Sequence, residues 1–247
     1  MFKVILWDID NTILNFNAAE KAALTKEFLE FNFGELSDEM LAVYTEINHK
    51  MWQALERGEM SKPQILVGRF EEFFGMYGLD IEQASAFNER YQELLGETIC
   101  FNDNAYEIIT DLKGKVLQCA ASNGTKKAQT GKLKNSGLDQ LFDLIFISED
   151  IGAEKPSVEF FDKSFEDIKV YFKENKMDSN TETDGESFDK AEVIIIGDSL
   201  TSDIKGANNA GIKSCWYNPN GLVNDKGVSV DYEIKDLHEI YDILANA

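Results

Sequence analysis

Histidine, cysteine and long apolar runs are scarce in this 247-residue chain, and each shortage excludes a class of protein. The two histidines, His49 and His238, form no ligand pair, so we expect neither a zinc centre nor a histidine nucleophile. No apolar run approaches the roughly 18 residues that a membrane-spanning helix needs. The N-terminus lacks the basic and apolar pattern of a signal peptide. We therefore expect no association with a membrane.

The three cysteines are odd in number, widely separated and without a CxxC pair. This usage is typical of a reducing compartment, so the predicted location is cytoplasmic. We expect Cys100, Cys119 and Cys215 to act as small buried apolar side chains.

Basic residues are few compared with acidic ones: 24 against 45, for a formal net charge of −21. A nucleic acid polymer is not an expected partner, because its binding depends on Lys and Arg that neutralise phosphates. The same charge repels small anions at long range. A phosphorylated substrate therefore requires local cations at its site.

Short apolar runs recur along the chain and alternate with helical patterns. This alternation predicts an α/β fold with a parallel sheet covered on both faces. The expected strands are Phe2–Trp7, Val116–Ala121, Leu144–Ile147, Val193–Ile196, Ser214–Tyr217 and a weaker one at Tyr232–Ile234.

A long interval after the first strand contains no convincing strand. Leu24, Phe28 and Phe31 have the i, i+4, i+7 spacing of a helix. Further helices are expected at about 37–57, 61–78 and 80–96. We therefore predict a helical domain over residues 15–100, inserted into a core made of residues 1–14 and 101–247.

The segment Asp178–Asp189 holds five acids and no basic residue. Its composition predicts a solvated loop. A metal-binding loop is the alternative, but the ligand spacing of an EF-hand is absent.

Two carboxylates, Asp8 and Asp10, follow directly on the first apolar run. On an extended backbone, residues two apart point to the same face. Like charges this close repel unless a cation or a shared proton compensates. The pair therefore indicates a divalent metal, an acid/base role, or both, and an enzyme is the leading interpretation.

Three further polar clusters lie at or near predicted strand ends. They are Ser122-Asn123-Gly124-Thr125, Lys155-Pro156, and Gly197-Asp198-Ser199 with Asp203. The carboxyl ends of parallel strands share one edge of the sheet, so all four clusters can converge there. Alone, each is equally well a helix cap, a surface charge or a turn. Together, in this chain order, they favour a function.

The four clusters contain the parts needed for phosphoryl transfer. Asp8 can attack phosphorus as a nucleophile, and Asp10 can protonate the leaving oxygen and then activate water. Ser122 and the N–H groups of Asn123 and Gly124 can hold phosphate oxygens.

The remaining charged residues fit a cation site. Lys155 can neutralise charge that builds on the phosphoryl group and restrain Asp8. Asp8, Asp198 and the Asp10 carbonyl offer the hard oxygen ligands that suit Mg²⁺. Asp203 can serve as a partner of Lys155 or of a metal-bound water.

At these residues the chain resembles the haloacid dehalogenase-like hydrolase superfamily. The matching motifs are Asp8–Thr12, Ser122, Lys155-Pro156 and Gly197-Asp198 through Asp203. The resemblance implies a Rossmann-like sheet, a Mg²⁺-dependent aspartyl-phosphate mechanism, and a place for Thr12 among the phosphate-binding residues. Asn11 departs from the pattern, since many members carry Gly there.

The inserted helices resemble the family's type C1 cap, which would choose the leaving group. Members that cleave carbon–halogen bonds lack the second Asp, so Asp10 favours phosphate esters.

The segments Asn48-His49-Lys50-Met51-Trp52 and Gly68-Arg69-Phe70-Glu71 are similar to the cap of house-cleaning pyrimidine 5′-nucleotidases. Candidate contacts to the leaving group are Asn48, Trp52 and Arg69. Packing inside the helical bundle is the preferred alternative for these residues and for the neighbouring aromatics. Arg69 has a further alternative, an ion pair with Glu71 or Glu72 on its own helix.

The sequence thus predicts a Mg²⁺-dependent 5′-nucleotidase for pyrimidine (deoxy)nucleoside monophosphates, as a monomer or small homo-oligomer. A phosphatase for sugar phosphates or phosphoglycolate, and a phosphosugar mutase, share the same chemistry and stay open. A non-catalytic binding module is the alternative of a different class.

Overall fold

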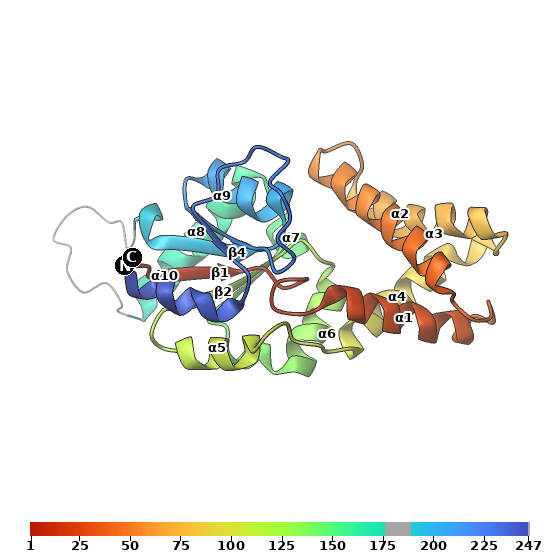
Figure 1. Ribbon diagram of the computed structural model, residues 1–247, viewed down its shortest axis with the longest axis horizontal. Coiled ribbons are helices and arrows are strands. Elements are labelled where there is room, and N and C mark those ends of the chain that lie inside the picture. The colour runs from red at the N-terminus through yellow and green to blue at the C-terminus, as the bar shows by residue number, and fades with distance from the viewer. Residues whose placement is uncertain (176–188, 247) are drawn as a thin grey trace. The chain divides into compact units, whose positions relative to one another are not determined.

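Six parallel β-strands organise one part of the chain in the computed structural model, which describes residues 1–175 and 189–246 (Figure 1). The strand order is β3-β2-β1-β4-β5-β6. The strands are β1 Val4–Trp7, β2 Leu117–Ser122, β3 Leu144–Ile147, β4 Val193–Gly197, β5 Lys213–Tyr217 and β6 Tyr232–Ile234. Each matches a predicted strand, with ends that differ by at most two residues. The fold is the predicted Rossmann-like α/β type.

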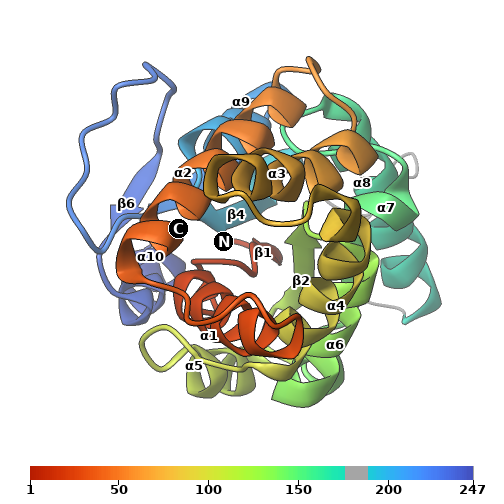
Figure 2. The same ribbon diagram turned by 90° about the vertical axis from the view of Figure 1, so that its right-hand side faces the viewer.

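The central strands β1 and β4 are buried along their whole length. Such continuous apolar strands need cover on both faces of the sheet. Helices α8 (Val158–Glu174) and α9 (Lys205–Ala210) cover one face, and α5 (Ala105–Leu112) and α10 (Ile240–Asn246) cover the other (Figures 1 and 2). The short α7 (Ser148–Ile151) follows β3.

The strand register aligns the carboxyl ends that carry the candidate residues. Trp7 of β1 lies opposite Ala120 of β2 and Ile196 of β4. One residue further along, Asp8, Ala121 and Gly197 are therefore level with one another. The loops that follow these three strands begin at the same edge.

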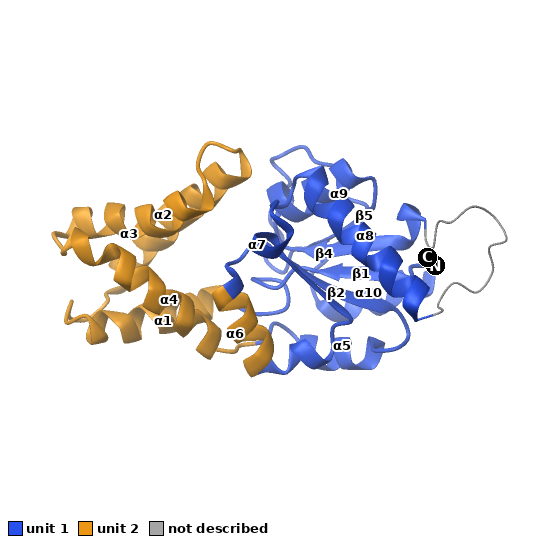
Figure 3. Ribbon diagram, turned by 180° about the vertical axis from the view of Figure 1, so that it is seen from behind, with its two compact units in different colours: residues 1–15, 101–126, 136–247 blue, residues 16–100, 127–135 orange. Residues whose placement is uncertain are grey.

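The second compact unit is helical and comprises residues 16–100 and 127–135 (Figure 3). Its helices are α1 Phe16–Glu30, α2 Asp38–Glu56, α3 Lys62–Tyr77 and α4 Ala84–Glu97, with most of α6 Lys126–Ser136. Helices α2, α3 and α4 fall where the sequence predicts them. Leu24 and Phe28 of the predicted apolar stripe are fully buried, whereas Phe31 lies just past the end of α1 and is partly buried.

Most of helix α6 belongs to the helical unit, and its two ends belong to the other unit. The predicted helical domain, residues 15–100, does not include any part of α6. Residues 127–135 pack with α4 through two glycines: a Cβ on Gly131 would lie 3.0 Å from the Cα of Gly96. Asn135 also donates to the carbonyl of Gly96 at 2.8 Å. Gly131 is therefore a helix-packing residue.

Two of the three cysteines are buried as predicted, Cys119 in β2 and Cys215 in β5. Cys100 is exposed, contrary to the prediction, because it lies beyond the end of α4. The acidic segment 178–189 falls outside the described residues, except Asp189, which caps the 3₁₀ turn Lys190–Glu192. Among the helices of residues 1–175 and 189–246, none is long and apolar enough to cross a membrane.

Candidate active site

The loop after β1 carries Asp8 and Asp10 and closes on itself through Leu14. The N–H of Asp8 donates to the carbonyl of Ile196 at 2.9 Å, so Asp8 still belongs to the sheet. The N–H of Asn11 then donates to the carbonyl of Leu14 at 2.7 Å. Asn11 has a φ of 60°, in the left-handed region where Asn and Gly are favoured. Asn therefore suits a position where many members of the family that the sequence resembles carry Gly.

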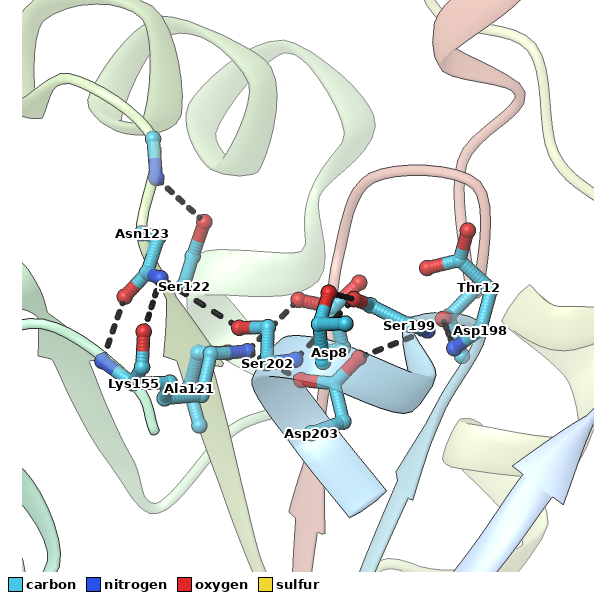
Figure 4. Close-up of polar contacts among 12 residues, drawn as sticks. Asp8, Thr12, Ala121, Ser122, Asn123, Lys155, Asp198, Ser199, Ser202 and Asp203 are labelled. Atoms are coloured by element: carbon cyan, nitrogen blue, oxygen red, sulfur yellow. Dashed lines mark hydrogen bonds and ion pairs between the residues drawn. The ribbon is translucent and has the colours of Figure 1, made fainter. Parts of the chain in front are cut away.

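Lys155 lies at the centre of the site, and its side chain is 1 % exposed. Its Nζ donates to Asp8 Oδ1 at 2.8 Å, to Asp203 Oδ1 at 2.6 Å and to the carbonyl of Ala121 at 2.6 Å (Figure 4). A lysine ammonium has three donors, so all three are used. Burial disfavours the charged ammonium, but Asp203 and Asp8 outweigh it and raise the pKa of Lys155.

The loop after β2 begins at Ser122, which is buried at the strand end. Its Oγ accepts a hydrogen bond from the N–H of Gly124 at 3.1 Å. Asn123 points the other way: its side chain bonds the main chain of Lys155 and the hydroxyl of Ser202 (Figure 4). The predicted phosphate-binding group is thus brought beside Lys155.

The loop after β4 is tied to the first loop through Thr12. The fully buried hydroxyl of Thr12 accepts from the N–H of Asp198 at 3.0 Å. Trp216 Nε1 donates to the Asp198 carbonyl at 2.9 Å. These two bonds hold the main chain of Asp198 on both sides, which positions its carboxylate.

A π-helical turn, η4 (Leu200–Ile204), carries Asp203. The Oδ2 atom of Asp203 accepts from the N–H of Ser199 at 3.1 Å, while its Oδ1 accepts from Lys155. A Cβ on Gly197 would lie 2.2 Å from Oδ2 of Asp203. Glycine is therefore required at the end of β4 for Asp203 to reach Lys155.

Asp8, Asp198 and Asp203 each place one carboxylate oxygen within 4.8 Å of the others. Burial raises the pKa of Asp8 to about 7, with contributions from Asp203 and Asp10 and opposed by Lys155. Burial and the charges of Asp8 and Asp203 also raise the pKa of Asp198 well above its ordinary value. One ammonium does not balance three carboxylates, so this donor set fits a divalent cation that prefers oxygen ligands, such as Mg²⁺.

The cluster of three carboxylates differs from the predicted set of metal ligands in one member. It includes Asp203, whereas the sequence pointed to Asp8, Asp198 and the main-chain carbonyl of Asp10. Both oxygens of Asp203 already accept hydrogen bonds, from Lys155 and Ser199. Asp8 and Asp198 are thus the carboxylates better placed to hold a cation.

The candidate leaving-group residues lie in the helical unit. Asn48 on α2 and Arg69 on α3 are buried, and Arg69 Nη1 donates to Asn48 Oδ1 at 2.7 Å. Arg69 Nη2 donates to Asn88 at 3.1 Å, so the alternative that Arg69 pairs with Glu71 or Glu72 is wrong. Trp52, one turn after Asn48 on α2, is partly exposed.

The aromatic residues of the same segment are packing residues. Phe70, Phe73 and Phe74 on α3 are fully buried in the core of the helical unit. This confirms the packing interpretation for them and leaves Trp52 as the more accessible candidate.

Sequence reasoning missed the side-chain role of Asn123 and the bond from Asp198 to Thr12. Both join residues that are far apart in the chain, by 32 and 186 positions. No local spacing rule signals such bonds, although Asn and Thr at strand ends are the residue types that make them.

Comparison with known proteins supports the family resemblance that the sequence motifs indicate. The family model of haloacid dehalogenase-like hydrolases matches residues 5–217. The HAD-hydrolase YfnB of Bacillus subtilis is 35 % identical over 98 % of this chain and 95 % of its own. A crystal structure of YfnB, described as bound to magnesium, superposes with a TM-score of 0.85 at 34 % identity over 98 % of both chains.

Two further relatives carry a substrate in their names. The pyrimidine 5′-nucleotidase PynA of Streptococcus pneumoniae is 32 % identical over 98 % of this chain and 95 % of its own. The pyrimidine 5′-nucleotidase YjjG of Escherichia coli is 26 % identical over 97 % of this chain and 96 % of its own. With the matched family model and the converging polar loops, these relatives show that the chain belongs to the haloacid dehalogenase-like hydrolases.

Proposed function

We propose that the protein is a Mg²⁺-dependent phosphomonoester hydrolase that works through an aspartyl-phosphate on Asp8. The observation that carries the proposal is the buried cluster in which Lys155 holds Asp8 and Asp203 while Asp198 lies beside them. This cluster combines a restrained carboxylate nucleophile, a fixed cation and a site for a metal.

In the first step, a carboxylate oxygen of Asp8 forms a bond to phosphorus while the ester P–O bond breaks. Asp10 donates its proton to the leaving oxygen, so the alcohol departs neutral. Lys155 engages Oδ1 of Asp8, so the attacking oxygen is the other one. Lys155 also offsets the negative charge that the phosphoryl oxygens accumulate.

In the second step, the Asp10 carboxylate takes a proton from water as that water attacks phosphorus. The bond between phosphorus and Asp8 breaks, which releases inorganic phosphate and regenerates the Asp8 carboxylate and the protonated Asp10. The Ser122 hydroxyl and the N–H of Asn123 are proposed to orient the phosphate. Thr12 and the Gly124 N–H are already engaged, with the Asp198 N–H and Ser122 Oγ, and are proposed to support the two loops. Mg²⁺, held by Asp8, Asp198 and the Asp10 carbonyl, would supply positive charge for the phosphoryl group.

We propose pyrimidine 5′-nucleoside monophosphates as the substrates, supported by the names of PynA and YjjG at 32 and 26 % identity over nearly the whole chain. The helical residues 15–100 are proposed to act as the family's cap and select the leaving group, with Trp52 the most accessible candidate contact. A cytoplasmic location is proposed on the cysteine usage.

Phosphate release from a panel of substrates tests this function. With Mg²⁺, kcat/KM is measured for dUMP, dTMP, UMP, purine nucleotides, sugar phosphates and phosphoglycolate. We expect a clear preference for the pyrimidine nucleotides. A preference for sugar phosphates would retain the chemistry and overturn the substrate, and no phosphate release from any compound would contradict the enzyme assignment.

The variant Asp8→Asn is the negative control. It keeps the shape of the side chain but removes the nucleophile, so kcat should fall by about three orders of magnitude or more while the protein still folds. Asp111→Asn is the matched control and should behave as the wild type, because Asp111 lies on α5 in an exposed ion pair with Lys115.

A further inference from the structure

The side chain of Asn123 is hydrogen-bonded to both main-chain polar groups of Lys155, the carbonyl and the N–H. Asn123 Nδ2 donates to the carbonyl of Lys155 at 2.8 Å, and the N–H of Lys155 donates to Asn123 Oδ1 at 2.8 Å (Figure 4). Lys155 lies in a turn, outside any helix or strand. The amide of Asn123 therefore supplies the pairing that a neighbouring strand would give in a sheet.

The same amide also contacts the segment that carries the acid partner of Lys155. Asn123 Nδ2 lies 3.3 Å from the acceptor Oγ of Ser202, which directly precedes Asp203 in η4. Asp203 in turn accepts from Lys155 Nζ at 2.6 Å. Asn123, Lys155, Asp203 and Ser202 thus form a closed ring across three loops.

This ring matters because the lysine side chain has a flexible four-carbon stem. The ammonium reaches three fixed acceptors only when the main chain stands at the right place. Two of the three acceptors lie on segments joined to Asn123. Asp203 follows Ser202, which Asn123 contacts, and Ala121 on β2 lies two residues before Asn123 in the chain.

We propose that the side chain of Asn123 is a positioning residue, which sets the main chain of Lys155 and thereby places its ammonium between Asp8 and Asp203. This role is separate from any phosphate contact of the Asn123 backbone N–H. Its effect on turnover rests on the proposed phosphatase function.

The first test is Asn123→Ala, with Asn209→Ala as matched control. Asn209 Nδ2 donates to the carbonyl of Pro156 at 2.9 Å, so the control removes an amide from the next residue without touching Lys155. We expect Asn123→Ala to lower kcat about 10- to 100-fold, as loss of a residue that orients a catalytic group does. KM should stay within about threefold, because Lys155 acts mainly as charge develops. Asn209→Ala should stay within about twofold of the wild type.

A double-mutant cycle with Asp203→Asn separates positioning from a direct substrate contact. If both residues act by placing the same ammonium, the double variant should be no more than about threefold slower than the slower single variant. The same cycle measured on thermal unfolding should show coupling of the two residues, and that readout needs no activity.

The proposal would be overturned if the kcat losses of Asn123→Ala and Asp203→Asn multiplied in the double variant. A wild-type kcat in Asn123→Ala, or an equal loss in Asn209→Ala, would also overturn it.

If Asn123→Ala does not fold, Asn123→Asp replaces it. That variant keeps the acceptor for the Lys155 N–H but has no donor for the Lys155 carbonyl, so a wild-type kcat would overturn the proposal. Failure of the phosphatase function itself would be distinguishable, because the wild type would then release no phosphate while the unfolding cycle still reports on the ring.

Discussion

At the scale of single residues, Lys155 is the side chain on which the site depends most. A buried ammonium is costly unless its donors are satisfied, and here two carboxylates and one carbonyl satisfy them. The arrangement fixes Asp8 in one orientation before any substrate arrives. Such preorganisation is what electrostatic stabilisation of a transition state requires.

Gly197→Ala tests how closely this cluster is packed. The added methyl group would lie 2.2 Å from Oδ2 and 2.3 Å from Cγ of Asp203, so Asp203 must move away from Lys155. We expect kcat to fall about 10- to 100-fold and the melting temperature to drop, measured by steady-state kinetics and calorimetry. Gly75→Ala is the control, because its methyl group would meet only Ile81 Cδ1 at 3.7 Å. An active, stable Gly197→Ala enzyme would contradict the packing argument.

The sequence predicts which residues gather at the site but not how they are joined. The order of the Asp8, Ser122, Lys155 and Asp198 clusters, each at or near a strand end, suffices to bring them together in a parallel sheet. The bonds of the Asn123 side chain depend on a turn 32 residues away and follow from no local pattern. Apolar periodicity specifies the scaffold, whereas side-chain orientation depends on tertiary contacts.

At the scale of elements, a polar network joins the four long helices α1 to α4 of the helical unit. Glu20 on α1 accepts from Asn48 on α2 at 3.1 Å and from Tyr91 on α4 at 3.2 Å. Arg69 on α3 donates to Asn48 at 2.7 Å and to Asn88 on α4 at 3.1 Å. Asn48 thus stands between a buried acid and a buried base, which favours a structural role for Asn48 and Arg69.

Arg69→Met distinguishes this structural role from contact with the leaving group. Removing the guanidinium leaves the buried Asn48 oxygen without its donor and takes a positive charge away from the buried Glu20, so the free energy of unfolding should fall by about 1–3 kcal/mol. Ratios of kcat/KM among nucleotides should stay unchanged at a temperature where the variant is folded. Arg57→Met, at an exposed pair with Glu59, serves as control. Altered nucleotide preference with wild-type stability would instead make Arg69 a substrate contact.

Glu27 on α1 is the other unusual acid of this unit. It is fully buried, and among the described residues its two carboxyl oxygens have no hydrogen-bond partner. Burial, helped by Glu30 and opposed by Arg90, raises the pKa of Glu27 from 4.5 to about 9. Between these values the unfolded chain releases the proton and the folded chain keeps it. Stability should therefore fall as pH rises, by up to about 1.4 kcal/mol per pH unit.

Glu27→Gln removes this titration while keeping the shape of the side chain. The melting temperature of the variant should exceed that of the wild type by a margin that grows from about pH 5 to about pH 9. Glu35→Gln, at an exposed position, should show no such trend. A margin that stays constant with pH, or grows toward acid, would contradict a protonated Glu27 in the folded protein.

The sequence predicts where the helices of this unit lie, but not which of them belong to it. The apolar spacing and the glycines predict α2, α3 and α4 within a few residues. The grouping of residues 127–135 with the helical unit depends on the contact between Gly96 and Gly131, which a linear pattern does not reveal.

At the scale of the whole molecule, the net charge of −21 opposes the approach of an anionic substrate. Salt screens this repulsion over about 10 Å at 0.1 M. We therefore expect kcat/KM for a nucleoside monophosphate to rise with ionic strength at constant Mg²⁺, while kcat changes less because it reports on the bound complex. A kcat/KM that falls steeply with added salt would indicate that a local basic surface dominates instead.

The most direct test of the account is to trap the covalent intermediate on Asp8. In Asp10→Asn, an aryl phosphate whose leaving group needs no proton can still phosphorylate Asp8, but the following attack by water lacks its base. With Mg²⁺, mass spectrometry should find one added phosphoryl group on the peptide that contains Asp8, and none in Asp8→Asn. If the wild type releases phosphate but Asp10→Asn carries no phosphoryl group, or carries it on another residue, the aspartyl-phosphate mechanism proposed for this protein is wrong.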